Sequence, residues 1–259
     1  MQSHQLCLPD NTVECDASTS VVYYKVACGA QECAAAFRLV YNAYLGAGLI
    51  DSNPFEMRVT PYQLLSTTDV FVAVCGREVI STVSLVAEGE LGLPMEAIYD
   101  AEVTQLRADG LRLAEVSALA DRRRELSRTL PVFRNLMRLM VQTARRRGIE
   151  RLLVAVHPRH AKFYQRVLNF EALGNEKSYP QVRNRPAVAL SLDFAQIDRV
   201  RPVNYDTFFA RSLPDEQLQP RPMSPEDRVH FELAAAASTN FTLVGAIDER
   251  RGQRTAGAA

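Results

Sequence analysis

Residues 151–174, RLLVAVHPRHAKFYQRVLNFEALG, constrain the fold of this chain more than any other stretch. The apolar run 152–156 ends two residues before a proline and is typical of a strand buried on both faces. Over residues 161–168, apolar and aromatic side chains recur at helical spacing, and Asn169 tolerates the left-handed backbone that commonly ends a helix. A new element begins at Phe170. The stretch therefore predicts a buried strand, a short helix and the start of a further element at Phe170.

Length and charge limit the possible classes of protein. The chain has 259 residues, of which 47% are hydrophobic, so it can bury a full core in one large domain. The formal net charge is zero, which gives no bulk electrostatic preference for nucleic acid or for an anionic membrane. The arginines are nevertheless clustered, because residues 122–151 contain ten of them against only Glu125 and Glu150. Either a solvated face or a docking surface for an acidic partner explains this cluster.

Cysteine usage and hydropathy indicate neither a metal site nor a membrane segment. The five cysteines, at positions 7, 15, 28, 33 and 75, form no paired motif and have no closely spaced histidine. No run approaches the roughly 18 apolar residues of a membrane span. The start of the chain lacks the basic segment and apolar core of a secretion signal. We therefore expect a soluble, cytoplasmic protein without a metal.

The first quarter of the chain predicts one strand and one helix. Residues 1–20 are polar and aperiodic, which predicts a flexible lead-in. The β-branched and aromatic run 21–27 predicts a strand, and apolar spacing of three and four residues predicts a helix over 31–46. Residues 50–69 contain prolines and many polar side chains, which is typical of an ordered loop over the core.

The middle of the chain predicts a hairpin, a helix and a strand with a carboxylate. Residues 70–75 and 79–86 predict two strands joined around Gly76. A helical segment over residues 94–110 follows. The run LAEVSALA then alternates as a strand that carries Glu115 among apolar neighbours. A carboxylate in such a strand is costly unless something uses or satisfies it.

The remainder predicts a helix, the strand and helix described first, a last strand and a tail. Pro131 predicts the first residue of the helix. The exposed stripe of this helix consists of Arg134, Arg138, Gln142 and Arg145. Residues 187–194 predict the last strand, and Ser224 predicts the cap of one further helix. We expect an α/β domain over residues 21–198 and an appendage over 199–259, partly helical and disordered at its end.

This order of elements resembles the fold of the Gcn5-related acetyltransferases (GNAT), an α+β fold in which helices flank a central, mixed, splayed sheet. A helix carrying FY and a return marked NFE resemble the end of that fold, where FYxxxGFE is usual. The resemblance implies that two central strands splay apart and that an acyl thioester lies in the gap. It also implies that backbone N–H groups of LAEVSALA face the thioester carbonyl.

The chain departs from this fold family after the strand LAEVSALA. Members that use coenzyme A place a glycine-rich loop, roughly Q/RxxGxG/A, there to cradle the pyrophosphate. Here the loop reads DRRRELSRTLP and contains no glycine. A donor without a pyrophosphate, the acyl-pantetheine arm of acyl carrier protein, needs no cradle. Arginines suit the acidic surface of such a partner, and the candidates are Arg122, Arg123, Arg124, Arg128, Arg134 and Arg138.

Five further blocks are similar to the long-chain N-acyl amino acid synthases, relatives of the acyl-homoserine lactone autoinducer synthases. The blocks are FRLVYNAYLGAGLI, NPFEMRVTPYQLL, LGLPMEAIY, LAEVSALA and HPRHAKFYQRVLNFEALG, spread over residues 21–195. The resemblance implies transfer of a fatty acyl group from acyl carrier protein to the α-amine of an amino acid, with no tightly bound cofactor. The glutamate of the autoinducer synthases corresponds to Glu115.

Aminolysis of a thioester requires an uncharged amine, and therefore a base. Glu115 is the first candidate and His157 the second, although each is also explained by a structural role. The N–H groups of Val116 to Ala118, with the Ser117 hydroxyl, are candidates to bind the oxyanion. Tyr164 occupies the position that in acetyltransferases often protonates the thiolate, and an aromatic core residue is the alternative.

The remaining candidates concern binding of the two substrates. Arg58 is a candidate for the substrate carboxylate, and Thr82 and Ser84 for the lining of the gap. A plain core and an acyl tunnel both explain the apolar set of Leu113, Leu119, Phe133, Leu136, Met137 and Met140. Two further functions stay open, a coenzyme A-dependent GNAT N-acetyltransferase and a non-catalytic regulator that binds acyl groups or carrier protein. The sequence indicates neither the amino acid, the acyl chain length nor the oligomeric state.

Overall fold

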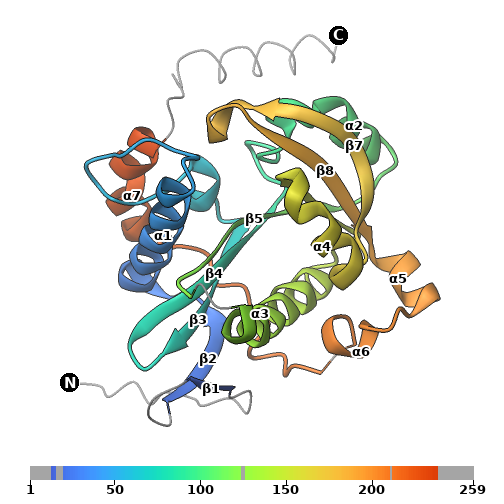
Figure 1. Cartoon of the computed structure of the whole chain (residues 1–259), viewed down its shortest axis with the longest axis horizontal. Helices are drawn as coiled ribbons and strands as arrows, with labels where there is room; N and C mark the ends of the chain where they lie inside the picture. Colours follow the sequence, from blue (N-terminus) through green and yellow to red (C-terminus); the bar gives the residue numbers. More distant parts are fainter. Residues whose placement is uncertain (1–12, 16–19, 124–125, 211, 239–259) are drawn as a thin grey trace.

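A computed structural model of the chain describes residues 13–15, 20–123, 126–210 and 212–238 (Figure 1). Within them, eight strands form one sheet in the order β1-β2-β3-β4-β5-β6-β8-β7. The strands are β1 (Val13–Cys15), β2 (Ser20–Val26), β3 (Thr68–Cys75), β4 (Glu78–Ala87), β5 (Leu113–Asp121), β6 (Arg151–Val156), β7 (Glu171–Tyr179) and β8 (Arg185–Asp193). The helices are α1 (Gly29–Gly46), α2 (Glu96–Ala108), α3 (Leu126–Arg146), α4 (Pro158–Leu168), α5 (Phe194–Val200), α6 (Tyr205–Phe208) and α7 (Pro225–Ser238), with 3-10 turns η1 (Pro61–Leu64) and η2 (Pro180–Val182). The predicted α/β fold class is confirmed.

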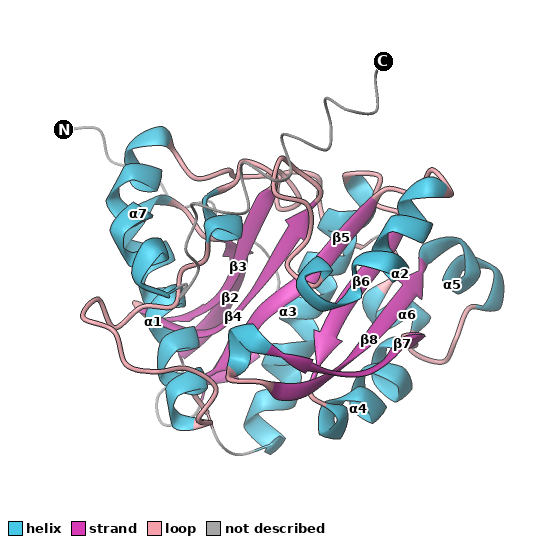
Figure 2. Cartoon of the chain, turned by 90° about the horizontal axis from the view of Figure 1, so that it is seen from above, coloured by secondary structure: helices cyan, strands magenta, loops and turns pink. Residues whose placement is uncertain are grey.

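The two central strands of the sheet separate after a short paired segment. β5 and β6 lie side by side in the middle of the sheet and run parallel, whereas all other pairs are antiparallel (Figure 2). Their ladder runs only from Leu113 opposite Arg151 to Glu115 opposite Leu153. Beyond Glu115, β5 continues to Asp121 without β6 as a partner. The predicted splay of the sheet is therefore confirmed.

The alternation of side chains along the strands divides the core into two layers. On β3, Val72 packs in one cluster with Phe37 of α1, while Phe71 packs in another with Leu136 of α3. Leu113 of β5 lies in a third cluster with Tyr99 of α2. The cross-strand pairs place this third cluster on the same face as α1. Helices α1 and α2 thus cover one face of the sheet, and α3 and α4 cover the other.

Two local predictions are confirmed and one is wrong. Gly76 has φ of 62° in the two-residue turn between β3 and β4, and Asn169 has φ of 59° at the end of α4. Pro131, predicted as the first residue of a helix, lies inside α3, which begins at Leu126. Pro131 is the sixth residue of α3, where a proline removes the hydrogen bond that its N–H would donate and crowds the carbonyl one turn earlier.

The segment after β8 crosses the molecule and packs on both layers. Gln142 was predicted on an exposed stripe of α3, but it is buried and accepts the N–H groups of Ser212 and Leu213. Further along, the N–H of Arg221 donates to buried Asp69 of β3, which also pairs with Arg147 at 2.7 Å. Helix α7 then lies beside α1, and Ser224 caps it as predicted (Figure 1).

The predicted lead-in and the end of the tail lie mostly outside the described residues. Of residues 1–20, Val13–Cys15 pairs with β2 as an edge strand. None of the described helices combines the length and apolar character that a membrane crossing needs. Likewise, within the described chain no three metal-binding side chains come together.

Candidate active site

Glu115 lies at the point where the two central strands separate. It is the last residue of β5 that pairs with β6, and only 3% of it is exposed. Its Oε2 atom accepts the N–H of Met95 at 2.7 Å, just before α2 begins. Strand alternation explains its direction, because Leu113, Glu115 and Ser117 point to the face that α1 and α2 cover. The carboxyl predicted from the sequence is therefore buried at the splay.

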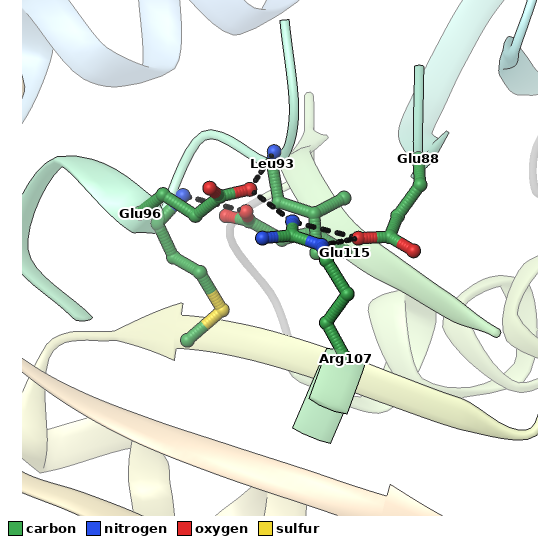
Figure 3. Close-up of polar contacts among 6 residues, drawn as sticks. Glu88, Leu93, Glu96, Arg107 and Glu115 are labelled. Carbon is green, nitrogen blue, oxygen red and sulfur yellow. Dashed lines mark hydrogen bonds and ion pairs between the residues drawn. The ribbon is translucent and has the colours of Figure 1, made fainter. Parts of the chain in front are cut away.

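A second carboxylate, Glu96, lies next to Glu115 (Figure 3). Glu96 accepts the N–H of Leu93 at 2.6 Å and pairs with Arg107 at 2.9 Å, and Arg107 also pairs with Glu88 at 2.7 Å. Burial raises the pKa of Glu115 to about 8, the charge of Glu96 raises it further, and the Met95 N–H opposes both. A carboxylate with so high a pKa takes a proton from an ammonium group at a smaller free-energy cost than an ordinary glutamate, whose pKa is about 4.3.

The strand that carries Glu115 is distorted two residues later. Ser117 pairs with Ser84 and Ala120 with Thr82, so Ala118 and Leu119 together lie opposite a single residue of β4. Ala118 has φ of 52°, in the left-handed region that L side chains rarely adopt. This bulge bends β5 where its N–H groups have lost β6 as a partner. Strain of this kind is concentrated at functional sites.

The bulge predicts opposite effects of two substitutions at Ala118. Ala118→Gly relieves the strain and should leave the folded state unchanged or more stable by about 1 kcal/mol. Ala118→Val adds a β-branched side chain at positive φ and should destabilise by at least about 1 kcal/mol. Chemical unfolding of the three proteins measures both effects. Equal stability of the valine and glycine variants would contradict the left-handed assignment.

Arg58 and two tyrosines lie on the same face as Glu115. The Arg58 guanidinium stacks over the Tyr44 ring at 4.9 Å and donates to the Gln181 carbonyl at 3.4 Å. Burial raises the pKa of Tyr44, Arg58 lowers it and Glu115 raises it, so all three groups interact. The Tyr179 hydroxyl donates to the Pro94 carbonyl at 3.1 Å, beside the loop residue that binds Glu115. Arg58 thus stacks on a tyrosine whose pKa the charge of Glu115 raises.

Tyr164 approaches this group from the opposite layer. It is buried on α4 and packs against Phe170 with ring centroids 5.6 Å apart. Burial raises its pKa above the ordinary value, and Tyr44 raises it further. In the motif FYxxxGFE of the acetyltransferases, three residues separate FY from the glycine. Here four residues separate FY from Asn169, which stands in place of that glycine.

His157, the second candidate for the base, caps a helix in the structure. It directly follows β6, and its Nδ1 atom accepts the N–H of Arg159 at 3.3 Å as the cap of α4. The ring lies 6.4 Å from that of His160. Position at the end of a central strand agrees with the prediction, but the capping bond occupies one ring nitrogen. Glu115 and His157 thus both remain candidates for the base, with Glu115 at the splay itself.

The hydroxyl groups predicted to line the gap differ in their availability. Ser84 and Ser117 are cross-strand neighbours on the face that carries Glu115. Thr82 is buried, and its hydroxyl donates to the Phe71 carbonyl at 2.9 Å. The structure brings Ser117 and Ser84 to the site and gives Thr82 a role in the sheet.

The six predicted tunnel residues divide between the two faces of the sheet. The larger group, on the face of α3, consists of Leu119, Phe133, Leu136, Met137 and Met140. Leu113 belongs to the cluster of α2 on the opposite face. The five residues near α3 can serve one acyl chain, and Leu113 is separated from them by the sheet.

The predicted docking arginines are not equally free. Arg123 makes two bonds to Asp121, at 2.6 and 3.0 Å, and Arg122 pairs with Glu78 while 58% of its side chain stays exposed. Arg134 is exposed and Arg138 is half-buried on α3. Arg124 and the side chain of Arg128 lie outside the described residues.

Sequence reasoning missed Tyr44, Tyr179 and Glu96. Tyr44 reads as one more apolar residue of a helix, and Tyr179 lies far from it in sequence. Glu96 is an acidic residue in the first turn of a helix, which is a common position. Only the tertiary fold shows that these side chains surround Glu115.

A splayed mixed sheet with a buried carboxyl at the splay and a bulged strand beside it defines a GNAT-like N-acyltransferase. The family model described as N-acyl amino acid synthase FeeM matches residues 35–193. The chain therefore belongs to the FeeM family of N-acyl amino acid synthases. No curated protein sequence matches it.

Solved structures agree with this assignment. FeeM, an N-acyl amino acid synthase from uncultured soil microbes, is 25% identical with a TM-score of 0.64, over 73% of this chain and 97% of that one. The AHL synthase LasI is 13% identical with a TM-score of 0.54, over 76% and 98%. BjaI, a CoA-dependent acyl-homoserine lactone synthase, is 16% identical with a TM-score of 0.52, over 83% and 99%. LasI and BjaI thus share the fold of this chain.

Proposed function

We propose that this enzyme acts in the cytoplasm and transfers a long-chain fatty acyl group from acyl carrier protein to the α-amine of an amino acid. The observation that carries the proposal is Glu115, a carboxyl buried where the central strands separate, with its pKa raised by burial to about 8. Membership of a family of N-acyl amino acid synthases supports the product class.

The proposed reaction uses the residues of both layers. Glu115 takes one proton from the substrate ammonium, and the free amine nitrogen attacks the thioester carbonyl carbon. N–H groups of Val116 to Ala118 at the bulge bind the oxyanion, with Ser117 beside them. The C–S bond then breaks and the amide forms. The amine nitrogen loses its second proton as the amide forms, and this proton reaches the departing thiolate through the Tyr164 hydroxyl, which gives one proton to sulfur and takes one back. Glu115 then releases its proton to solvent.

Two binding roles follow from the positions of charged and apolar groups. Arg58 binds the amino acid carboxylate, which directs the amine inward toward Glu115. The fatty acyl chain enters between the strands and α3, where Leu136, Met137 and Met140 are buried. Long, flexible methionine side chains adapt easily to such a ligand.

The donor assignment rests on the segment between β5 and α3. Only four residues separate Asp121 from Leu126, and none is a glycine that could form a pyrophosphate cradle. BjaI shares the fold and is described as CoA-dependent, so the fold alone does not define the donor. Tight coenzyme A binding in calorimetry would favour coenzyme A as the donor here too.

The exposed arginine of α3 gives a test of carrier-protein docking. Arg134→Glu should raise the KM for acyl carrier protein about three- to tenfold at low salt, because it places a negative charge opposite an acidic partner. The effect should shrink as salt is added. Arg38→Glu, exposed on α1 on the other face of the sheet, is the matched control. Equal KM values for both variants would place docking elsewhere.

Expression in a bacterial host and mass spectrometry of lipid extracts test the proposed function. An N-acyl amino acid should accumulate with the wild type and be absent with Glu115→Gln. Its mass gives the head group and the chain length together. An extract without such a product, at equal levels of folded protein, would count against the proposal.

A further inference from the structure

The C-terminal helix α7 lies beyond residue 193, where the family match ends. It is anchored on the same side of the sheet as α1. Phe231 is fully buried and meets the Phe37 ring of α1 edge-on, with centroids 5.1 Å apart. Ala234 and Ala235 are buried in the same cluster, which also contains Met57 and Val59. The helix therefore has a fixed position against the loop that carries Arg58.

The last described residue of α7 makes a specific contact with that loop. The Ser238 hydroxyl accepts the N–H of Val59 at 3.2 Å and donates to the carbonyl of Met57 at 3.0 Å. One hydroxyl thus binds the residues on both sides of Arg58. The Arg58 N–H itself donates to the Phe37 carbonyl at 3.1 Å. Because residues 57–59 belong to no helix or strand, these side contacts fix their backbone.

A pocket of about 250 Å³ opens beside this contact. Its lining includes Arg58, Gln181 and Arg183, together with Ala237 and Ser238 of α7. Arg183 faces Asp51 at 3.5 Å, and both side chains are more than half exposed. The pocket is large enough for an amino acid side chain, and Arg58 joins it to the tyrosines near Glu115.

We infer that α7 completes the acceptor site, with Ser238 as a positioning residue for Arg58 and Ala237 as part of the wall that selects the acceptor side chain. The inference rests on the proposed function, because it takes Arg58 as the group that binds the acceptor carboxylate. It assigns a role in substrate choice to a segment outside the family match.

Steady-state kinetics of Ser238→Ala test the positioning role. The acceptor is the standard L-amino acid that the wild-type enzyme uses best in a panel at equal concentration. The acceptor KM should rise about three- to tenfold, while kcat and the KM for the acyl donor change less than twofold. Ser238→Thr, which keeps the hydroxyl, should restore the wild-type acceptor KM. An unchanged acceptor KM in folded Ser238→Ala, or no rescue by threonine, would overturn the positioning role.

Ala237→Leu tests the wall independently. Ala237 is exposed, so the larger side chain should not disturb packing of α7. It should lower kcat/KM for bulky acceptors more than for glycine and alanine. The ratio of kcat/KM for bulky acceptors to kcat/KM for small ones should fall about tenfold. An unchanged ratio would remove α7 from the specificity pocket. Absence of N-acylation by the wild type would instead contradict the proposed function, so the two failures are distinguishable.

Discussion

Replacing Glu115 by glutamine is expected to lower kcat/KM by about 10²- to 10⁴-fold, the usual contribution of a general base. Glutamine keeps the shape of the side chain and an oxygen that can accept the Met95 N–H, so the fold should persist. It cannot take a proton from the ammonium group. In the wild type, activity should rise with pH through about 8, where Glu115 ionises, and the residual activity of the variant should lack that dependence.

The same substitution should stabilise the protein at high pH. The folded-state pKa of Glu115 is raised above its unfolded value, so the folded state binds the proton more tightly. The stability that protonated Glu115 contributes is fully present below its pKa in the unfolded chain. This contribution is lost as the pH rises from that value to about 8. Glutamine does not titrate, so the Tm difference between variant and wild type should grow by several degrees from pH 5 to pH 8.5.

Kinetics and thermal unfolding over that pH range measure both effects. Glu176→Gln, on the exposed surface of β7, is the matched control and should change neither activity nor Tm. Full activity of Glu115→Gln would assign the base elsewhere, with His157 next to be tested. A Tm difference independent of pH would contradict the raised pKa.

Arg58→Gln is expected to raise the KM for the amino acid about 10- to 100-fold. A charge-assisted bond to a carboxylate contributes about 1.5–3 kcal/mol, and glutamine keeps only a neutral donor. The KM for the acyl donor should be unchanged, because Arg58 lies on the face of α1 rather than that of α3.

Arg183→Gln is the control for Arg58→Gln, since Arg183 lines the same pocket but is more than half exposed. It should change the amino acid KM much less. Isotope-labelled amino acid and separation of the amide product give both constants. If Arg58→Gln leaves the amino acid KM unchanged, another group binds the carboxylate.

Much of the fold could be predicted because its signals are local. Strand alternation predicted that Glu115 lies on a buried strand. Asparagine tolerates the left-handed backbone conformation, which predicted that Asn169 ends a helix. Pro131 was misread because proline favours the first position of a helix, whereas α3 already begins at Leu126. Gln142 was misread because its partners lie about 70 residues later in the tail.

The surroundings of Glu115 could not be predicted for a related reason. The bulge at Ala118 depends on the register between β4 and β5, which no local pattern of LAEVSALA shows. Tyr44 belongs to α1 and Tyr179 to the end of β7, far apart in the sequence, yet burial and the charge of Glu115 raise the pKa of both. Ser238 contacts a loop about 180 residues earlier. The burial of Glu115 was therefore predictable, and the side chains around it were not.

The central claim is most directly tested with purified enzyme, long-chain acyl carrier protein and the standard L-amino acids in one reaction. We predict one N-acyl amino acid for each free carrier-protein thiol released, detected by mass spectrometry and thiol titration, and little product when acyl-coenzyme A replaces the acylated carrier protein. Turnover with acyl-coenzyme A alone, or thiol release without an amide, would contradict this account.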